Sequence, residues 1–231
     1  MARDALSFAS TKIQPPRLRS GWLARDTLFA QLARGLLESR LTLVSAAGGF
    51  GKSCAMAQAL AAPTSPAHGL RCAWIACDEG DTLAVLCTAL VAALEPFDLP
   101  WRHAPEALIA ALGRGEATRG FRDALVNALA ATDVPRAVIV FDDLHRLSDP
   151  RALEFLAALA QALPDHWGLA LLTRVDPPWS LARLRAAGEL TEVRQDDLRF
   201  GVAEIEDLAR HAGRVDAAPA LLARTEGWRS A

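Results

Sequence analysis

A run of small residues followed by lysine and serine is the part of the sequence best suited to chemistry. Positions 46–53 read A-A-G-G-F-G-K-S, between the apolar run "LTLV" and the alanine-rich run "CAMAQALAA". Small residues let backbone N–H groups approach an anion closely, and the positive end of a following helix strengthens such a site. Lys52 adds a flexible point charge and Ser53 a hydroxyl group, which suit phosphate and Mg²⁺ respectively.

This stretch matches the P-loop pattern Gly-x-x-x-x-Gly-Lys-Ser/Thr except at its first position, where alanine replaces glycine. Alanine is small enough to begin such a loop. Lysine is also unusual here, because the chain has two lysines against 23 arginines. The alternative is a glycine-rich turn with a merely solvated lysine. We favour nucleotide binding, through Ala46, Ala47, Gly48, Gly49, Phe50, Gly51, Lys52, Ser53 and Cys54.

Cys54 stands where a hydroxyl residue often contacts the α-phosphate, and a thiol is a weaker donor. A helix N-terminus lowers the pKa of a thiol, so a redox switch is an alternative role for this residue. A bound phosphate would oppose that role. The other cysteines form no CxxC pair or His/Cys cluster, so we expect structural roles for them rather than zinc binding.

Two carboxylates follow a second apolar run, "AVIVF", at Asp142 and Asp143. This arrangement is typical of a Walker B motif. We expect Asp142 to bind Mg²⁺ together with Ser53, and Asp143 to orient or deprotonate the attacking water. Without the glycine-rich loop, the two residues would indicate only a turn or a helix cap. We expect a structural role for His145.

Arg174 follows a third apolar run, "LALLT", and could detect the γ-phosphate if this strand lies between the other two. The alternative for Arg174 is a surface salt bridge. The segment "CDEGD", from Cys77 to Asp81, also follows a strand candidate. Its carboxylates could approach Mg²⁺, but a capping turn explains them equally well.

Alternating apolar runs and helical repeats must position these residues. Strands are expected at 41–46, 71–77, 136–141, 168–173 and 190–194, and helices at 25–39, 52–62, 83–94, 121–131, 153–163 and 181–186. A loop containing Pro, Trp and His is expected between 94 and 121. Strands that alternate with helices predict an α/β fold with a parallel sheet.

The chain is expected to divide into three parts. Residues 1–24 contain paired prolines and form an extended lead-in, residues 25–200 form the nucleotide-binding domain, and residues 201–231 begin a truncated helical domain. The 231 residues are 52% hydrophobic with a net charge of −2, as in a soluble globular protein. We therefore expect a cytoplasmic protein with no membrane contact and no direct DNA binding.

Six ordered motifs together resemble the nucleotide-binding region of large LuxR-type bacterial transcriptional regulators, the group of the maltose-regulon activator. These regulators belong to the STAND class of P-loop ATPases. The motifs are "KIQPPRLRSGWLARDTLFAQL", "VSAAGGFGKS", "WIACDEGD", "VIVFDDLHRL", "LLTRVDPPWSLARLRAAGELTEVRQDDLRF" and "LLARTEGW".

The resemblance implies a P-loop NTPase fold with a five-stranded sheet in the order 5-1-4-3-2, followed by a helical domain. It implies an ATP/ADP switch with Mg²⁺, in which ADP holds a closed monomer and ATP with an inducer gives an oligomer that activates promoter DNA. It supports the roles of Lys52, Ser53, Asp142, Asp143 and Arg174 given above. It also implies an adenine contact around Leu23, Ala24 and Arg25, and another near the base at Gly227 and Trp228.

The sequence also departs from that family. The winged-helix domain, the superhelical sensor repeats and the helix-turn-helix are missing, so we expect this chain alone neither to bind DNA nor to sense an inducer. Two other functions remain open: a turnover ATPase of the AAA+ kind, and a non-catalytic interaction domain with a degenerate P-loop. A switch predicts tight binding with slow hydrolysis, a turnover ATPase predicts fast hydrolysis, and an interaction domain predicts no nucleotide binding.

Overall fold

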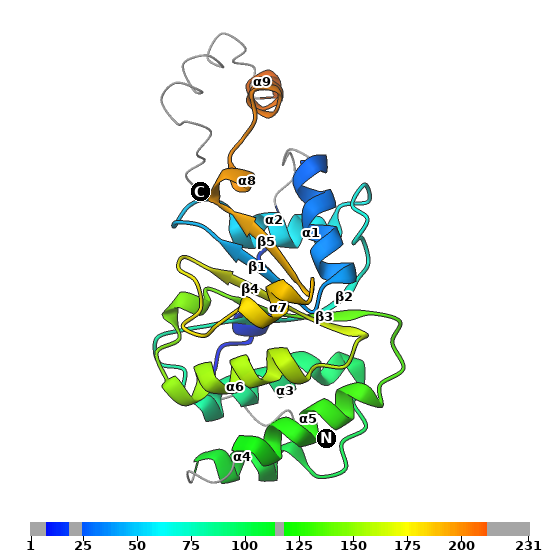
Figure 1. The fold of residues 1–231 in the computed structure, drawn as a ribbon, viewed down its shortest axis with the longest axis vertical. Coiled ribbons are helices and arrows are strands. Elements are labelled where there is room, and N and C mark those ends of the chain that lie inside the picture. The colour runs from blue at the N-terminus through cyan, green and yellow to red at the C-terminus, as the bar shows by residue number, and fades with distance from the viewer. Residues whose placement is uncertain (1–7, 19–24, 114–117, 212–231) are drawn as a thin grey trace.

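A parallel five-stranded sheet forms the centre of the computed structural model, which describes residues 8–18, 25–113 and 118–211. The strand order is β2-β3-β4-β1-β5, which is the predicted order read from the other edge (Figure 1). The P-loop NTPase fold is therefore confirmed. The strands are β1 (Leu41–Ser45), β2 (Arg71–Ala76), β3 (Ala137–Asp142), β4 (Trp167–Thr173) and β5 (Leu190–Arg194).

Helices cover both faces of the sheet, which explains why the central strands are apolar on both sides. Strands β1, β3 and β4 are buried along their whole length. Neighbouring residues of one strand enter different cores: Ile139 and Phe141 pack on one side of the sheet, and Val138 and Val140 pack on the other. This alternation is the two-residue period of a strand.

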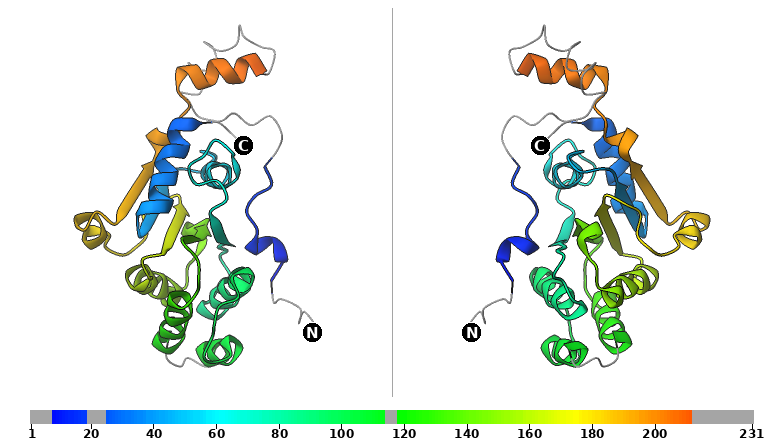
Figure 2. Two further views of the ribbon diagram at one scale, coloured as in Figure 1. Left: turned by 90° about the vertical axis from the view of Figure 1, so that its right-hand side faces the viewer. Right: turned by 90° about the vertical axis from the view of Figure 1, so that its left-hand side faces the viewer.

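Helices lie on both sides of the sheet (Figures 1 and 2). One core holds α1 (Asp26–Glu38) and α2 (Lys52–Ala61), and the other holds α3, α5, α6 and the short α7. Their bounds are Leu83–Leu94, Thr118–Ala130, Pro150–Ala162 and Ala182–Ala186. Helices α8 (Gln195–Leu198) and α9 (Val202–His211) follow β5. Within the described ranges, every helix is too short or too polar to cross a membrane.

One helix lies where the sequence suggested only a loop. Helix α4 runs from Pro105 to Gly113 and packs against α3 and α5. Proline fits the first position of a helix because the N–H there has no intrahelical partner. The following residues are good helix formers, and Leu112 is buried in the core. The Pro, Trp and His residues just before this helix concealed its start.

The N-terminal segment is not simply extended. It contains a short 3-10 helix, η1 (Ser10–Ile13), and packs against β2 and α3 (Figure 2). Phe8 and Ile13 contact the core beneath α3. Since β2 is an edge strand, residues 8–18 lie beside a sheet edge that would otherwise be open. We call residues 8–18 the strap.

Candidate functional site

The glycine-rich loop lies at the carboxyl end of β1 and leads directly into α2, as the sequence predicted. Two of its glycines, Gly49 and Gly51, have φ angles of 83° and 73°. This left-handed region is readily open to glycine and costs other residues energy. Gly51 precedes the first residue of α2, so the loop delivers Lys52 and Ser53 to the positive end of a helix.

Lys52 is held over the loop by neutral groups. Its Nζ donates hydrogen bonds to the carbonyl oxygens of Ala46, at 2.8 Å, and Ala47, at 3.0 Å, and the side chain is only 6% exposed. Burial lowers the pKa of Lys52, while the nearby charge of Asp143 opposes this shift. Because both acceptors are uncharged, the positive charge remains able to attract an anion at the loop.

Ser53 and Asp142 meet across 89 residues of sequence. The Ser53 Oγ donates to Asp142 Oδ1 at 2.7 Å. Asp142 ends strand β3 and is 7% exposed, and this burial raises its pKa to about 6 against hydrogen bonds from Ser53 and the Asp143 N–H. A hydroxyl and a carboxylate are oxygen ligands of the kind Mg²⁺ prefers, and a cation would offset the burial of this carboxylate. The donor set therefore fits Mg²⁺.

Asp143 has an unusual backbone and a half-exposed carboxylate. Its φ is 52°, in the left-handed region, where residues other than glycine are uncommon. Its Oδ1 lies 3.9 Å from His145 Nδ1, and that nitrogen is buried without a hydrogen-bond partner among the described residues. Burial lowers the pKa of His145, which keeps the ring neutral. Strained and unsatisfied groups of this kind concentrate at functional sites.

Arg174 directly follows β4, which lies between β1 and β3, as its predicted role requires. Its guanidinium packs on the glycine-rich loop: a Cβ added to Gly48 would lie 3.2 Å from the Arg174 Cζ. The charge of Arg174 also contributes to lowering the pKa of Lys52 and of His145. The structure thus brings Arg174 together with Lys52, Ser53, Asp142 and Asp143 at one edge of the sheet.

Arg25 makes contacts that the sequence did not predict. Its buried guanidinium donates to the carbonyl oxygens of Leu198, at 3.0 Å, and Arg199, at 2.6 Å. It also pairs with Glu204 at 2.9 Å and stacks 4.3 Å from the centre of the Phe200 ring. The hydrogen bonds of Arg25 thus hold the start of α9. Its adenine contact stays a prediction, and Leu23, Ala24, Gly227 and Trp228 lie outside the described residues.

The junction of β5 and α8 also reaches the loop, which the sequence did not reveal. The Ala47 N–H donates to Gln195 Oε1 at 3.4 Å, and Asp176 pairs with Arg194 at 3.0 Å. Each residue ends or follows a strand of the parallel sheet. Position after a strand was therefore the available signal, because such residues gather at one edge. Cys54 lies in the first turn of α2 and is half-buried.

The segment "CDEGD" forms a hydrogen-bonded turn. Asp81 Oδ2 accepts the N–H of Asp78 at 2.8 Å and an ion pair from Lys12 at 2.6 Å. The caps of helix α3 come from other residues: Thr82 Oγ1 accepts the N–H of Val85 at 3.4 Å, and Asp149 Oδ2 accepts the N–H of Leu83 at 2.7 Å. Of the two explanations left open by the sequence, these contacts favour the turn. Among the described residues, no cluster of His, Cys, Asp and Glu could hold a metal ion by itself.

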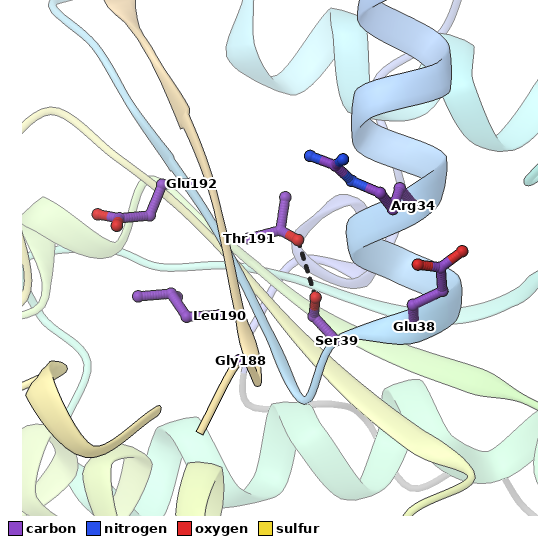
Figure 3. A pocket seen from close by; sticks show the side chains of 7 residues that line it. All are labelled: Arg34, Glu38, Ser39, Gly188, Leu190, Thr191 and Glu192. Carbon is purple, nitrogen blue, oxygen red and sulfur yellow. Dashed lines mark hydrogen bonds between the residues drawn. The ribbon is translucent and has the colours of Figure 1, made fainter. Parts of the chain in front are cut away.

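A separate cavity of about 290 Å³ lies at the opposite end of the sheet, where β1 and β5 begin (Figure 3). Ser39 and Thr191 share a hydrogen bond of 2.8 Å there, and Thr191 points toward α1, away from Leu190 and Glu192 (Figure 3). The phosphate-binding candidates lie at the carboxyl ends of the strands. This cavity therefore plays no part in their site.

Known proteins are similar to this chain in sequence and in fold. The chain is 28% identical to the HTH-type transcriptional regulator MalT of Cronobacter sakazakii over 192 residues, covering 82% of this chain and 20% of that protein. It is 29% identical to the serine/threonine-protein kinase PknK of Mycobacterium tuberculosis over 227 residues, covering 94% and 20%. The chain thus spans about one fifth of the length of these relatives.

A solved structure with the same fold is the STAND protein with a tetratricopeptide repeat sensor from Pyrococcus horikoshii. It matches 92% of this chain and 29% of its own with a TM-score of 0.63, at 15% identity. The family model described as an AAA ATPase domain matches residues 21–173, which is more than half of the chain and contains the loop and the Asp142–Asp143 pair. Such a domain implies nucleotide binding. This chain belongs to the AAA ATPase domain family.

Proposed function

We propose that the chain is an ATP/ADP-binding switch module that hydrolyses ATP slowly. The observation that carries this proposal is the convergence of Lys52, Ser53, Asp142 and Arg174 around one glycine-rich loop, with the Lys52 ammonium hydrogen-bonded to two neutral carbonyl oxygens. The loop amides and Lys52 would bind the β- and γ-phosphates, and Arg174 would contact the γ-phosphate from the side of Gly48.

Ser53 and Asp142 would hold Mg²⁺, which supplies positive charge that offsets the charge of the phosphates. Asp143 follows Asp142 in a half-exposed position from which its carboxylate would orient or deprotonate a water molecule. His145 lies beside that carboxylate. Arg174 would add positive charge where negative charge develops during hydrolysis.

The similarity to MalT and to a STAND protein supports a regulatory switch over a turnover enzyme. The chain spans only one fifth of MalT. We therefore propose an inducer, a self-oligomer and promoter DNA as partners only of a longer protein that contains this chain. We also propose the division into a lead-in of residues 1–24, a nucleotide-binding domain of residues 25–200 and a helical part of residues 201–231. A cytoplasmic location is part of the same proposal.

A titration with Mg-ATP and Mg-ADP tests the function, after any co-purified nucleotide has been identified and removed. Wild type is compared with Lys52→Ala, and steady-state release of phosphate is measured in parallel. We expect wild type to bind both nucleotides and to release phosphate slowly. Lys52→Ala should lose the binding while keeping the circular dichroism spectrum of wild type.

The other functions predict different results in the same experiment. A turnover ATPase predicts fast phosphate release that rises with protein concentration as oligomers form. An interaction domain predicts that folded wild-type protein binds neither nucleotide. Either result would overturn the switch.

A further inference from the structure

Lys12, the other lysine of the chain besides Lys52, has no part in the proposed phosphate site. Lys12 lies in the strap, in the short 3-10 helix η1, and its side chain is only 11% exposed. Its Nζ lies 2.6 Å from Asp81 Oδ2, and Asp81 is 5% exposed. Both side chains lose much of their hydration, so removal of either one would leave the other charge poorly compensated.

The Asp81 carboxylate organises the loop that follows β2. Besides Lys12, its Oδ2 accepts the N–H of Asp78 at 2.8 Å, and the Asp81 N–H donates back to the Asp78 carbonyl at 3.1 Å. Lys12 therefore fixes a carboxylate that in turn fixes the backbone of Asp78. We call residues 77–82 the β2 loop.

The β2 loop is bound on its other side to the turn that carries Asp142 and Asp143. The Cys77 N–H donates to the Asp142 carbonyl at 2.8 Å, and Asp78 Oδ1 pairs with Arg146 at 2.7 Å. The Arg146 N–H closes the turn by donating to the Asp143 carbonyl at 2.9 Å. A continuous series of direct contacts therefore leads from Lys12 to Asp143, through the carboxylates of Asp81 and Asp78 and then through Arg146.

The Cys77 thiol lies near charged groups from both the Lys12–Asp81 pair and the Asp142–Asp143 turn. Burial raises the pKa of the Cys77 thiol, and the charges of Asp81, Lys12, Asp142 and Asp143 all act on that one thiol. Cys77, which begins the β2 loop, therefore lies near both the Lys12–Asp81 pair and the Asp142–Asp143 turn. The contacts of the strap therefore extend beyond the edge of β2 to the β2 loop.

We propose that Lys12 is a positioning residue of the ATPase site: by pairing with Asp81 it fixes the β2 loop, and through Asp78 and Arg146 it sets the geometry of the Asp142–Asp143 turn. The strap is then part of the site, although it lies far from the glycine-rich loop in the sequence. This inference rests on the proposed function, in which that turn holds Mg²⁺ and orients water.

Amide hydrogen exchange of the nucleotide-free chain tests the contact path directly. We compare wild type with Lys12→Met, with Lys12→Arg and with Arg17→Met, which removes an exposed cation from the same strap. We expect Lys12→Met to increase exchange in the β2 loop and in residues 143–147. Lys12→Arg should restore protection, and Arg17→Met should match wild type. Increased exchange confined to residues 8–18 and β2 would show that the strap only covers an edge, and would overturn the proposal.

Nucleotide measurements on the same variants give a second readout. Lys12→Met should lower the turnover of Mg-ATP by ~10-fold, as removal of an outer-shell partner commonly does. Its affinity for ATP in excess chelator should stay within ~2-fold of wild type, since the phosphate loop is unchanged. Equal losses of turnover and of metal-free affinity would contradict the proposal.

Asp81→Asn provides an independent variant should Lys12→Met fail to fold, because asparagine keeps an acceptor for the Asp78 N–H. It should reproduce the increased exchange in residues 143–147. Failure of the proposed function is distinguishable, because wild type would then bind no Mg-ATP while the exchange experiment would still report the contact path.

Discussion

Lys12 and Lys52 are the only lysines in the sequence, and both have little exposed surface, at 11% and 6%, but their partners differ in charge. Lys12 pairs with a buried carboxylate, so its charge is neutralised within the fold. Lys52 contacts two carbonyl oxygens, so its charge is not neutralised by its hydrogen-bond partners. A buried cation held by neutral groups indicates a ligand site, whereas one held by an anion indicates a structural link.

The carboxylates repeat this contrast. Asp81 is buried against Lys12, but Asp142 is buried against the hydroxyl of Ser53, and its pKa rises to about 6. One carboxylate is balanced by the chain itself, and the other is left for a cation. The predictions below test whether the two lysines and the two carboxylates differ as this comparison requires.

Lys52→Met should have the largest effect of these variants, and the effect should be on nucleotide binding rather than on the free energy of unfolding. Losing two or three charge-assisted hydrogen bonds to phosphate, about 4 kcal/mol in all, should weaken Mg-ATP binding roughly 1,000-fold. The free energy of unfolding should change by less than about 1 kcal/mol, because the lost bonds to carbonyl oxygens are offset by removing a buried charge. Isothermal titration and urea unfolding measure the two quantities. A large loss of stability with binding retained would reverse the roles of the two lysines.

Lys12→Met should show the opposite pattern in urea unfolding. It leaves the Asp81 carboxylate buried without its cation, which should cost about 4 kcal/mol of unfolding free energy. The double variant Lys12→Met/Asp81→Asn removes both charges and keeps an acceptor for the Asp78 N–H. It should recover most of that loss. If the double variant loses as much unfolding free energy as Lys12→Met and Asp81→Asn lose separately when summed, the two charges do not stabilise each other.

Asp142 should make the nucleotide-free chain less stable as pH rises. Its pKa is raised from 3.8 to about 6, so the folded chain holds this proton more tightly than the unfolded chain does. The contribution is fully present below about pH 4 and is lost as pH rises through about 6, for a total of about 3 kcal/mol. Asp142→Asn should remove this dependence and be more stable than wild type at pH 7.

Urea unfolding at several pH values measures this difference, and the comparison with the variant cancels the other titrating groups. Saturating Mg-ATP should reduce the difference at pH 7, because a cation favours the ionised carboxylate. Parallel pH profiles for wild type and Asp142→Asn would show that the carboxylate is already balanced, as Asp81 is.

Gly48→Ala should have the smallest effect. The added methyl group would lie 3.2 Å from the Arg174 Cζ, and the end of a flexible side chain can move away cheaply. We expect unfolding free energy to change by less than about 1 kcal/mol and phosphate release to slow by roughly fivefold, through displacement of the guanidinium. Gly120→Ala on α5 is the matched control, since its added Cβ would meet nothing within 4 Å among the described residues. Equal rates for both variants would remove Arg174 from the site.

The strands and the place of the phosphate loop were predictable, because apolar strands, glycines and short polar ends are local signals. The sheet order came from the resemblance to a known family. Helix α4 was missed because proline and aromatic residues before Pro105 looked like a loop. The partners of Lys12 and Arg25 could not be predicted, since 69 residues separate Lys12 from Asp81 and 179 separate Arg25 from Glu204. The domain boundary that we propose at residue 200 also lies between Arg25 and that partner in the sequence.

The strand order has a consequence for how the chain forms during synthesis. Strand β1 is complete at Ser45, but its neighbours β4 and β5 begin only at Trp167 and Leu190. At synthesis rates of about 5–20 residues per second, the strand that leads into the phosphate loop waits on the order of 10 s for its first partner. Strands β2 and β3, which pair directly with each other, become available earlier. The outer half of the sheet can therefore assemble before the half that carries the glycine-rich loop.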